Sequence, residues 1–323
     1  MTPARPTAPL PPHGTRQARL GRRALVRPAA ALLALSMLPA LAPAALAQPI
    51  VLRDDLGTEH RFDAPPQRIV SMLPSLTETV AVLGGARRLV GVDRYSNWPA
   101  EVNALPRLGG LDDAQIESIA RLKPDVVLAA RSARTLDKLQ ALGLRVIRLQ
   151  SDSHADVRRS LGLVAALLGT PDEGERVWAR QTAQITAAAA RVPPALRGQR
   201  VYFELGGGPY AAGASSFIGE TLARLGLANT VPPELGPFPK FNPEFVVRAR
   251  PELVMGSARD QAARLARPGW HSLPAVQQQR LCGFDEATYE LLTRPGPRLG
   301  EAAAALADCL VNLGTTRGAG LSR

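Results

Sequence analysis

The chain has 323 residues with 39 basic and 28 acidic side chains, which gives a formal net charge of +11. Six of the arginines but none of the acids lie in residues 1–47, so the rest of the chain holds 33 basic against 28 acidic residues. The basic character therefore belongs mostly to the N-terminus and gives no indication of nucleic-acid binding. The 276 residues after position 47 are enough for two lobes with separate cores.

Residues 1–47 have the pattern of a cleaved signal peptide. An arginine-rich start is followed by an uncharged stretch from Pro28 to Ala47 that ends in small residues. An uncleaved membrane anchor is the alternative, because roughly 20 uncharged residues could just cross a bilayer, although two prolines within the stretch count against it. A pair of adjacent arginines in this segment is compatible with export by either the Sec route or the twin-arginine route. No cysteine lies near the cleavage site, so we expect a periplasmic protein without a lipid anchor.

Residues 48–151 are predicted to form an N-terminal lobe. A short hairpin is expected over residues 51–66, where Asp55-Leu56-Gly57 has the composition of a turn. Strands and helices then alternate, which predicts parallel strands with crossover connections. The predicted strands cover residues 69–71, 89–92, 126–129 and 146–149, and the predicted helices cover residues 76–83, 114–122 and 133–142.

Residues 152–195 are predicted to be a connecting helical segment, because they contain almost no strand signal. A first helix is expected over residues 155–168, where Gly169 ends it, and a longer one over residues 171–191. Pro171 suits the first turn of that helix, and two further prolines stop it after residue 192. A helix of about 20 residues is roughly 30 Å long. It could join two lobes rigidly, so little closure of the lobes is expected.

Residues 196–323 are predicted to form a C-terminal lobe that repeats the first. The spacing of Glu117, Arg121 and Pro124 recurs 127 residues later at Glu244, Arg248 and Pro251, each time as a short helix followed by an apolar strand. In both copies proline disfavours a helical residue before it. The predicted fold class is therefore α/β, with two Rossmann-like lobes, a ligand cleft between them and a single long helix joining them.

Metal and catalytic motifs are missing from the sequence after position 47. Its histidines, His60, His154 and His271, are not at the spacing of metal ligands, and no Cys-x-x-Cys or His-Glu-x-x-His motif occurs. Residues 213–217 do not match the Gly-x-Ser-x-Gly pattern of a nucleophile elbow. Residues 206–211 match the spacing of a dinucleotide-binding motif, but Pro209 and Tyr210 are poorly suited to the start of a phosphate-binding helix. We therefore predict no metal, no resident cofactor and no enzymatic activity.

Several short stretches, in this order, resemble the helical-backbone (class III) periplasmic substrate-binding proteins that deliver cobalamin, haem or iron-siderophores to ABC importers. The stretches that carry the resemblance are residues 54–57, 66–78, 89–93, 105–109, 116–125 and 294–298. Residues 95–99 and 208–213 are most similar to the vitamin-B12-binding branch, whereas Gly109-Gly110 stands where that branch has a tryptophan and haem carriers have a tyrosine.

The resemblance implies a function in transport. The protein is expected to be a monomer that binds cobalamin or a related metal chelate and delivers it to a permease with its ATPase. A ferric-siderophore or haem carrier of the same family is the first alternative. A periplasmic enzyme and a ligand-sensing adaptor are further alternatives.

The resemblance also implies a docking role for Glu117 and Glu244, since one glutamate of each lobe faces the permease in this family. The alternative is local: each acid lies early in a predicted helix, with an arginine four residues later that could form an ion pair.

The ligand is expected to contact side chains in the loops at the strand ends. A flat macrocycle is best held by aromatic and apolar faces, and core packing is the alternative for each aromatic. Two arginines flank the rigid loop Pro295-Gly-Pro297 and could bind anionic ligand groups or remain plain surface charges. The candidate ligand-binding residues are Tyr95, Trp98, Tyr210, Phe217, Phe238, Phe241, Arg294 and Arg298.

The two cysteines, Cys282 and Cys309, are expected to form a disulfide. The protein is predicted to reach an oxidising compartment, and Cys282 ends a predicted strand beside the C-terminal helix that carries Cys309. Two buried free thiols are the alternative.

Overall fold

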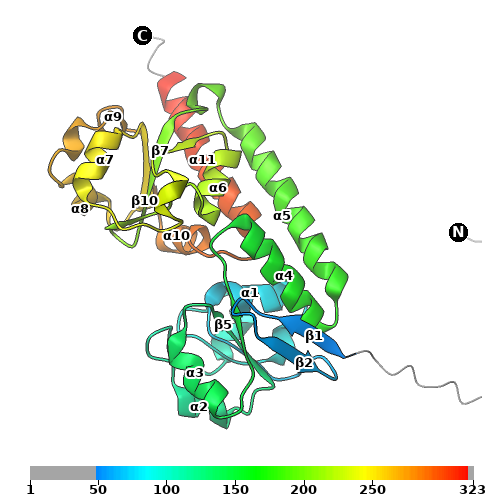
Figure 1. Ribbon diagram of the computed structural model, residues 1–323. Coiled ribbons are helices and arrows are strands. Elements are labelled where there is room, and N and C mark those ends of the chain that lie inside the picture. The colour runs from blue at the N-terminus through cyan, green and yellow to red at the C-terminus, as the bar shows by residue number, and fades with distance from the viewer. Residues whose placement is uncertain (1–48, 319–323) are drawn as a thin grey trace, which may run out of the picture. The chain divides into compact units, whose positions relative to one another are not determined.

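The computed structural model describes residues 49–318, and Figure 1 shows their arrangement. The predicted signal peptide, residues 1–47, lies outside the described residues. Within the described part of the chain, no helix is long and apolar enough to cross a membrane.

The N-terminal lobe begins with the predicted hairpin. Strands β1 (Ile50–Arg53) and β2 (Glu59–Phe62) pair antiparallel. Their turn is closed by Asp54, whose Oδ1 accepts hydrogen bonds from the backbone N–H groups of Leu56 and Thr58. Gly57 lies in the left-handed region with a φ of 83°, where a side chain would be strained.

The sheet of the N-terminal lobe has four parallel strands in the order β4-β3-β5-β6. Its strands are short apolar runs that are almost wholly buried, as parallel strands covered on both faces must be. The strands are β3 (Ile69–Ser71), β4 (Leu89–Val92), β5 (Val126–Ala130) and β6 (Val146–Leu149), and the helices are α1 (Pro74–Val82), α2 (Ile116–Arg121) and α3 (Asp137–Ala141).

Two predicted helices of this lobe are shorter than expected. The helix predicted at 114–122 covers only Ile116–Arg121, because the segment before it turns back against the end of β4. The helix predicted at 133–142 is a 3₁₀ turn, Arg134–Leu136, followed by α3. Alanine and leucine favour helix at these positions, and the loop geometry around the sheet edge overrides that preference.

The C-terminal lobe repeats the order of the strands. Its parallel strands run in the order β9-β7-β10-β11, with β8 added antiparallel to β7. The two lobes therefore have like topology, and the predicted fold class is confirmed. The strands are β7 (Arg200–Leu205), β8 (Tyr210–Ala211), β9 (Ala228–Asn229), β10 (Leu253–Ser257) and β11 (Leu281–Phe284), and the helices are α6 (Phe217–Arg224), α7 (Pro243–Ala249), α8 (Gln261–Leu265), α9 (Pro274–Gln277) and α10 (Glu286–Leu292).

The sequence repeat corresponds to a repeated backbone feature. The basic residue before each proline, Lys123 and Arg250, has a positive φ, 45° and 47° respectively. The acid after each proline then accepts a backbone N–H bond at the start of the first parallel strand of its lobe, β3 or β7. Asp125 bonds to the N–H of Arg68 at 2.8 Å, and Glu252 bonds to the N–H of Arg200 at 3.0 Å.

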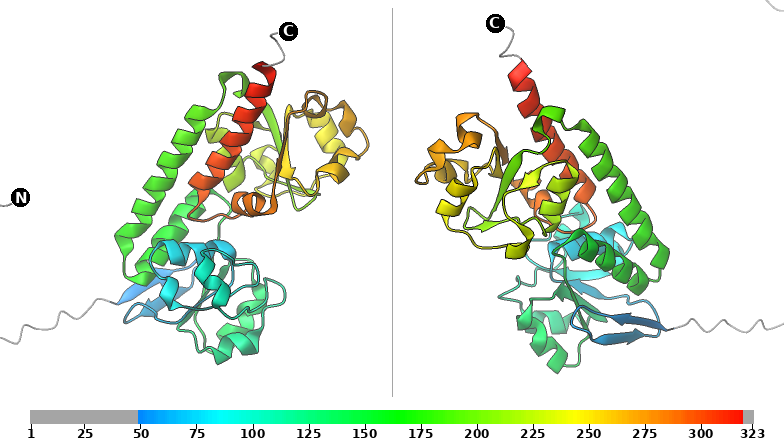
Figure 2. Two further views of the ribbon diagram at one scale, coloured as in Figure 1. Left: turned by 180° about the vertical axis from the view of Figure 1, so that it is seen from behind. Right: turned by 45° about the horizontal axis from the view of Figure 1, so that its top comes forward.

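The connecting segment consists of helices α4 (His154–Leu168) and α5 (Pro171–Arg191). Ser153 and Asp156 form a capping box at the start of α4, and Gly169 ends the helix with a φ of 82°. The last helix, α11 (Leu299–Gly318), packs against α5, as the views of Figure 2 show. One buried apolar cluster runs through α4, α5 and α11 into both lobes, so the connection is a packed body and not a free linker.

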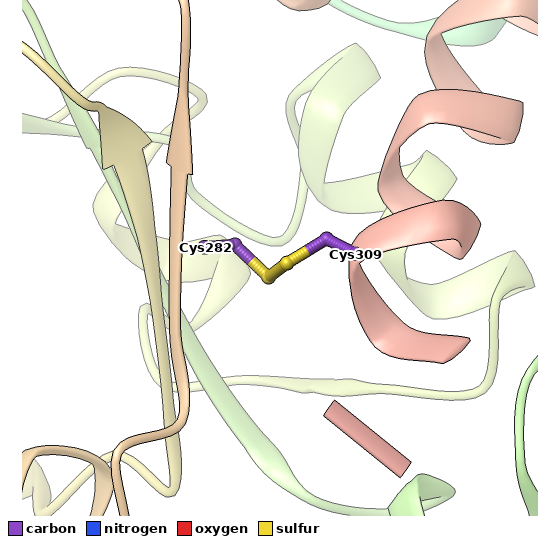
Figure 3. The surroundings of a disulfide bond; sticks show 2 residues. All are labelled: Cys282 and Cys309. Atoms are coloured by element: carbon purple, nitrogen blue, oxygen red, sulfur yellow. A yellow bond between two sulfur atoms is a disulfide. The ribbon is translucent and has the colours of Figure 1, made fainter. Parts of the chain in front are cut away.

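A disulfide joins Cys282 of β11 to Cys309 of α11, the pair that the sequence predicts (Figure 3). Cys282 is the second residue of its strand and not the last. The bond ties the edge of the second sheet to the helix that packs on the connector.

Candidate functional site

A cleft of about 840 Å³ opens between the two lobes. Ala130, Leu149 and Leu205 lie at the ends of β5, β6 and β7 and line it, so strand ends of both sheets meet there. In open α/β sheets such carboxyl ends are the usual place for a ligand. The remaining lining residues are Leu56, Leu73, Arg131, Ser132, Arg134, Asp137, Arg148, Gln150, Ser151, Asp152, Phe217, Ile218, Phe238, Thr293 and Pro295.

The wall that the C-terminal lobe contributes is apolar and aromatic. Phe217 and Phe238 meet edge to face, with 5.9 Å between ring centroids, and Leu205 and Ile218 lie on the same wall. Phe217 is the first residue of α6 because Ser216 caps that helix, accepting a bond from the N–H of Gly219 at 2.9 Å. Such a wall can pack against the face of a large ring.

The wall that the N-terminal lobe contributes is polar and carries arginines. Arg131 donates to the Gln150 amide oxygen at 2.8 Å, and the buried Arg148 pairs with Asp137 at 2.6 Å. Arg134 is exposed, and its guanidinium has no hydrogen-bond or ion-pair partner among the described residues. This wall can therefore bind an anionic group of a ligand.

None of the residues that line the cleft is a histidine, cysteine, methionine or tyrosine. Elsewhere in residues 49–318, no three His, Cys, Asp or Glu side chains come together as a metal site. The cleft thus offers a metal ion no soft or imidazole ligand.

Tyr95 and Trp98 lie on the loop after β4. The Asp93 side chain holds this loop by accepting bonds from the N–H of Tyr95 and the hydroxyl of Ser96, and burial raises the pKa of Asp93. Tyr95 is 62% exposed and borders a hollow of about 200 Å³ that shares Leu73 with the cleft. Tyr95 therefore lies at the rim of the cleft, outside its floor.

Arg294 and Arg298 contact the N-terminal lobe, and neither lines the cleft. Arg294 donates to Glu78 at 2.9 Å, to Asn97 at 2.8 Å and to the carbonyl of Tyr95 at 3.1 Å. The guanidinium of Arg298 lies 4.6 Å from the centre of the Trp98 ring. Because both arginines are engaged in these contacts, they hold the Tyr95–Trp98 loop against the C-terminal lobe.

Glu78, the acid at the centre of these contacts, is buried in α1 and is 1% exposed. Burial raises its pKa, although Arg294 and Arg298 act in the opposite direction. Oε2 of Glu78 has no hydrogen-bond partner in the described part of the chain. The cluster is thus a buried ion pair between the lobes, set beside the cleft.

Two other aromatic candidates lie in the C-terminal lobe away from the cleft floor. Tyr210 is 48% exposed on β8, next to Leu205, which does line the cleft. Phe241 stacks on Phe245 with 4.2 Å between centroids and borders a separate hollow of about 150 Å³ beside Tyr202. Of the six aromatic candidates, the structure brings only Phe217 and Phe238 together in the cleft.

Glu117 and Glu244 occupy equivalent positions as the second residues of α2 and α7. Both are exposed, and neither lines the cleft. Glu244 lies 3.9 Å from Arg248, a loose ion pair four residues on, whereas Arg121 bonds to Ser118 at 3.0 Å. The local ion pair therefore accounts for one glutamate only.

The arginines of the cleft, Arg131, Arg134 and Arg148, were not predicted from the sequence. Arg131 follows β5 directly, and Arg134 comes three residues later, so both stand where parallel strands deliver ligand-binding residues. This position was the signal that could have identified them.

Comparisons with known proteins agree with this geometry. The family described as periplasmic binding protein matches residues 69–288. The vitamin B12-binding protein of Pectobacterium atrosepticum is 26% identical over 77% of this chain and 90% of its own length. An uncharacterised ABC transporter substrate-binding lipoprotein, YvrC of Bacillus subtilis, is 24% identical over 81% of this chain and 85% of its own.

Two solved structures share the fold. The periplasmic haem-binding protein RhuT from Roseiflexus sp. RS-1 has a TM-score of 0.65 and 26% identity, covering 76% of this chain and 98% of that one. The periplasmic vitamin B12 binding protein BtuF of Vibrio cholerae has a TM-score of 0.65 and 22% identity, covering 77% of this chain and 98% of that one.

Proposed function

The chain belongs to the periplasmic binding protein family, and we propose that it captures cobalamin or a related metal chelate in the cleft and delivers it to the permease of an ABC importer. Relatives named for vitamin B12 binding match most of the chain and most of their own length. In this role the protein catalyses no reaction, and specificity comes from the cleft.

The lining of the cleft is the observation that carries the choice of ligand. Its residues include no histidine, methionine, cysteine or tyrosine, and its apolar wall suits a ring face. Haem leaves axial positions on iron that proteins usually fill with His, Met, Cys or Tyr. Cobalamin and hexadentate chelates saturate their own metal and need only packing and hydrogen bonds. The cleft therefore favours a coordinatively saturated chelate.

Arg131 and Arg134 favour a ferric siderophore as the second candidate. The guanidinium of Arg134 has no hydrogen-bond or ion-pair partner within residues 49–318, and a guanidinium binds carboxylates and catecholate oxygens by charge-assisted bonds. Tyr95 and Tyr210, exposed on the two lobes beside the cleft, would contact the edge of either ligand. Haem binding through Tyr95 is the remaining alternative.

Glu117 and Glu244 are the proposed docking residues. They are exposed, repeat between the lobes and lie outside the cleft, so permease arginines could reach both without touching the ligand. The mature protein, after loss of residues 1–47, would act as a monomer in the periplasm.

Absorption spectroscopy tests the proposal. The purified protein is mixed in turn with cyanocobalamin, a ferric tris-catecholate and haemin, and retention of colour after gel filtration is measured. Retention of cyanocobalamin or the ferric chelate at one per chain supports the proposal. Retention of haemin alone, with a spectrum of Tyr-ligated iron that disappears in Tyr95→Phe, would contradict it.

A further inference from the structure

The loop of residues 206–209, here called the glycine loop, joins β7 to β8 with the sequence Gly-Gly-Gly-Pro. Its three glycines have φ values of 60°, 70° and 82°, a region that favours glycine over other residues. The loop does not line the cleft, but Leu205 before it does, and Tyr210 after it pairs with Leu205 across the hairpin. Three successive glycines lose much conformational freedom when they are ordered, so the conformation of the loop depends on the contacts around it.

Arg267, which follows α8, makes the first of these contacts. Its guanidinium bonds to the carbonyl of Gly207 at 2.9 Å and lies 5.0 Å from the centre of the Trp270 ring. The same group forms an ion pair with Glu204 of β7, whose side chain is fully buried. A Cβ at Gly208 would lie 2.9 Å from Nη2 of Arg267 and would disturb this contact. The guanidinium therefore connects the glycine loop to the core of the lobe.

Tyr289 of α10 makes the second contact; α8 and α10 are both labelled in Figure 1. Its hydroxyl accepts the N–H of Gly206 at 2.8 Å and donates to the carbonyl of Glu204 at 3.2 Å. Its ring stacks on Phe203 of β7 with 6.3 Å between centroids. Two side chains from separate parts of the lobe thus hold neighbouring glycines of the same loop.

The N-terminal lobe holds a loop beside the cleft by a similar arrangement. Arg294 bonds to the buried Glu78 at 2.9 Å and to the carbonyl of Tyr95 at 3.1 Å. Arg267 does the same with the buried Glu204 and a carbonyl of the glycine loop. In each lobe, an arginine fixed by a buried glutamate therefore holds the loop that carries or precedes an exposed tyrosine. A loop that is ordered before the ligand arrives costs less entropy on binding, which favours affinity.

We propose that Arg267 and Tyr289 are positioning residues for ligand capture, because they hold the glycine loop in the conformation that keeps Tyr210 beside the cleft. Neither residue lines the cleft, so both act through the loop. The inference rests on the proposed function, in which Tyr210 contacts the chelate. Without these contacts the loop becomes mobile, and the ligand has to order the loop and the tyrosine when it binds.

Arg264 of α8 is the matched control for Arg267. It also bonds to Glu204, at 2.9 Å, but it bonds to the carbonyl of Ser257 in β10 where Arg267 bonds to the glycine loop. The side chain of Arg264 is 3% exposed and that of Arg267 is 20% exposed. Arg264→Met should therefore lower the melting temperature at least as much as Arg267→Met does. A purely structural role predicts that both variants weaken ligand binding, whereas positioning predicts that only Arg267→Met does.

Amide hydrogen exchange without ligand tests whether the two residues hold the loop. The N–H of Gly208 is the reporter, because its bond to the carbonyl of Leu205, at 3.1 Å, is left in place by every substitution used. Its exchange should be at least about fivefold faster in Arg267→Met and in Tyr289→Phe, and unchanged in Arg264→Met, relative to core amides of β10.

Titration with the chelate that the wild type retains tests the role in ligand capture. Affinity should fall at least about tenfold in Arg267→Met and about threefold in Tyr289→Phe, and stay within about twofold in Arg264→Met. In a protein that already carries Tyr210→Ala, adding Arg267→Met should weaken binding by less than about twofold, because the positioned ring is gone. If Arg267→Met does not fold, Tyr289→Phe, which removes one hydroxyl group, takes its place in both comparisons.

The proposal is overturned if exchange in the loop stays as in the wild type in both Arg267→Met and Tyr289→Phe, or if their ligand affinity is unchanged. It is also overturned if Arg264→Met weakens binding as much as Arg267→Met, or if the loss in Arg267→Met is equally large with and without Tyr210. Failure of the proposed function gives a different pattern, in which the wild type retains none of the chelates while loop exchange still accelerates in Arg267→Met and Tyr289→Phe. That pattern would overturn the role in ligand capture and leave the contacts with the loop intact.

Discussion

Replacing Arg294 by methionine should destabilise the protein strongly, because it breaks the ion pair between the lobes. Arg294 is 10% exposed at its side chain and Glu78 is 1% exposed, and their charged atoms are 2.9 Å apart. Methionine keeps much of the side-chain volume but leaves the Glu78 carboxylate buried without its main partner. Asn97 and the carbonyl of Tyr95 also lose a donor.

The expected loss is about 3 kcal/mol of unfolding free energy. Removing one partner of a buried ion pair costs about 3–5 kcal/mol. The lower end applies because Arg298 stays 3.7 Å from Glu78, and because Glu78, whose pKa is already raised by burial, can take up a proton. The loss should therefore shrink as the pH is lowered. For a chain of this size it corresponds to a fall in melting temperature of roughly 6–12 °C.

Urea unfolding followed by circular dichroism measures the loss at pH 7 and pH 5. Glu290→Gln is the control, since Glu290 also bonds to Arg294 but is 37% exposed, and it should cost less than about 1 kcal/mol. Adding Glu78→Gln to Arg294→Met should cost little more than Arg294→Met alone. A loss below about 1 kcal/mol in Arg294→Met, or one equal to that of the control, would show that this ion pair does not hold the lobes together.

Three further predictions concern other parts of the chain. The pKa of His154 falls from 6.5 to about 4 on folding, so the unfolded chain takes up a proton at a higher pH than the folded chain does. Up to about 3 kcal/mol of unfolding free energy should therefore be lost between pH 7 and pH 4, and less should be lost in His154→Phe. Urea titrations at several pH values will measure this loss. Replacing Cys282 and Cys309 by serine should cost about 3.5 kcal/mol for a loop closed over 27 residues, and the wild type should take up no alkyl group without reduction in mass spectrometry. Reversing the charge of Glu117 and Glu244 together should abolish uptake in reconstituted vesicles while chelate affinity stays within about twofold. Weakened chelate binding in this double variant would mean that the two glutamates contribute to the ligand site instead of to docking.

The fold could be predicted well wherever the sequence pattern is local. The helix at 171–191 is observed with the predicted bounds because Pro171 starts it and a pair of prolines follows it. The strand bounds in the N-terminal lobe agree with prediction to within one residue, since buried parallel strands are short apolar runs set between turns. The repeat of short helix, proline and acid predicted the like order of strands in both lobes.

The site was harder to predict because it depends on contacts between distant segments. Arg294 was expected to face the ligand, yet it contacts Glu78, 216 residues away, and no local pattern indicates this pairing. Aromatic composition pointed equally to Phe217 and Phe238, which meet in the cleft, and to Phe241, which stacks on Phe245 instead. The side a loop residue faces is fixed by the packing of the whole lobe.

Titration of a variant with a filled cleft shows whether the ligand binds between the lobes. Ser132 is exposed and lines the cleft, so Ser132→Trp should occupy ligand space without disturbing the core. Thr315→Trp is the control, because Thr315 is also exposed and lies on α11 outside the cleft lining. With the chelate that the wild type retains, we expect binding of one ligand per chain, unchanged affinity in Thr315→Trp and at least tenfold weaker binding in Ser132→Trp at an unchanged melting temperature. Equal affinity in all three proteins would mean that the ligand binds outside the cleft between the lobes.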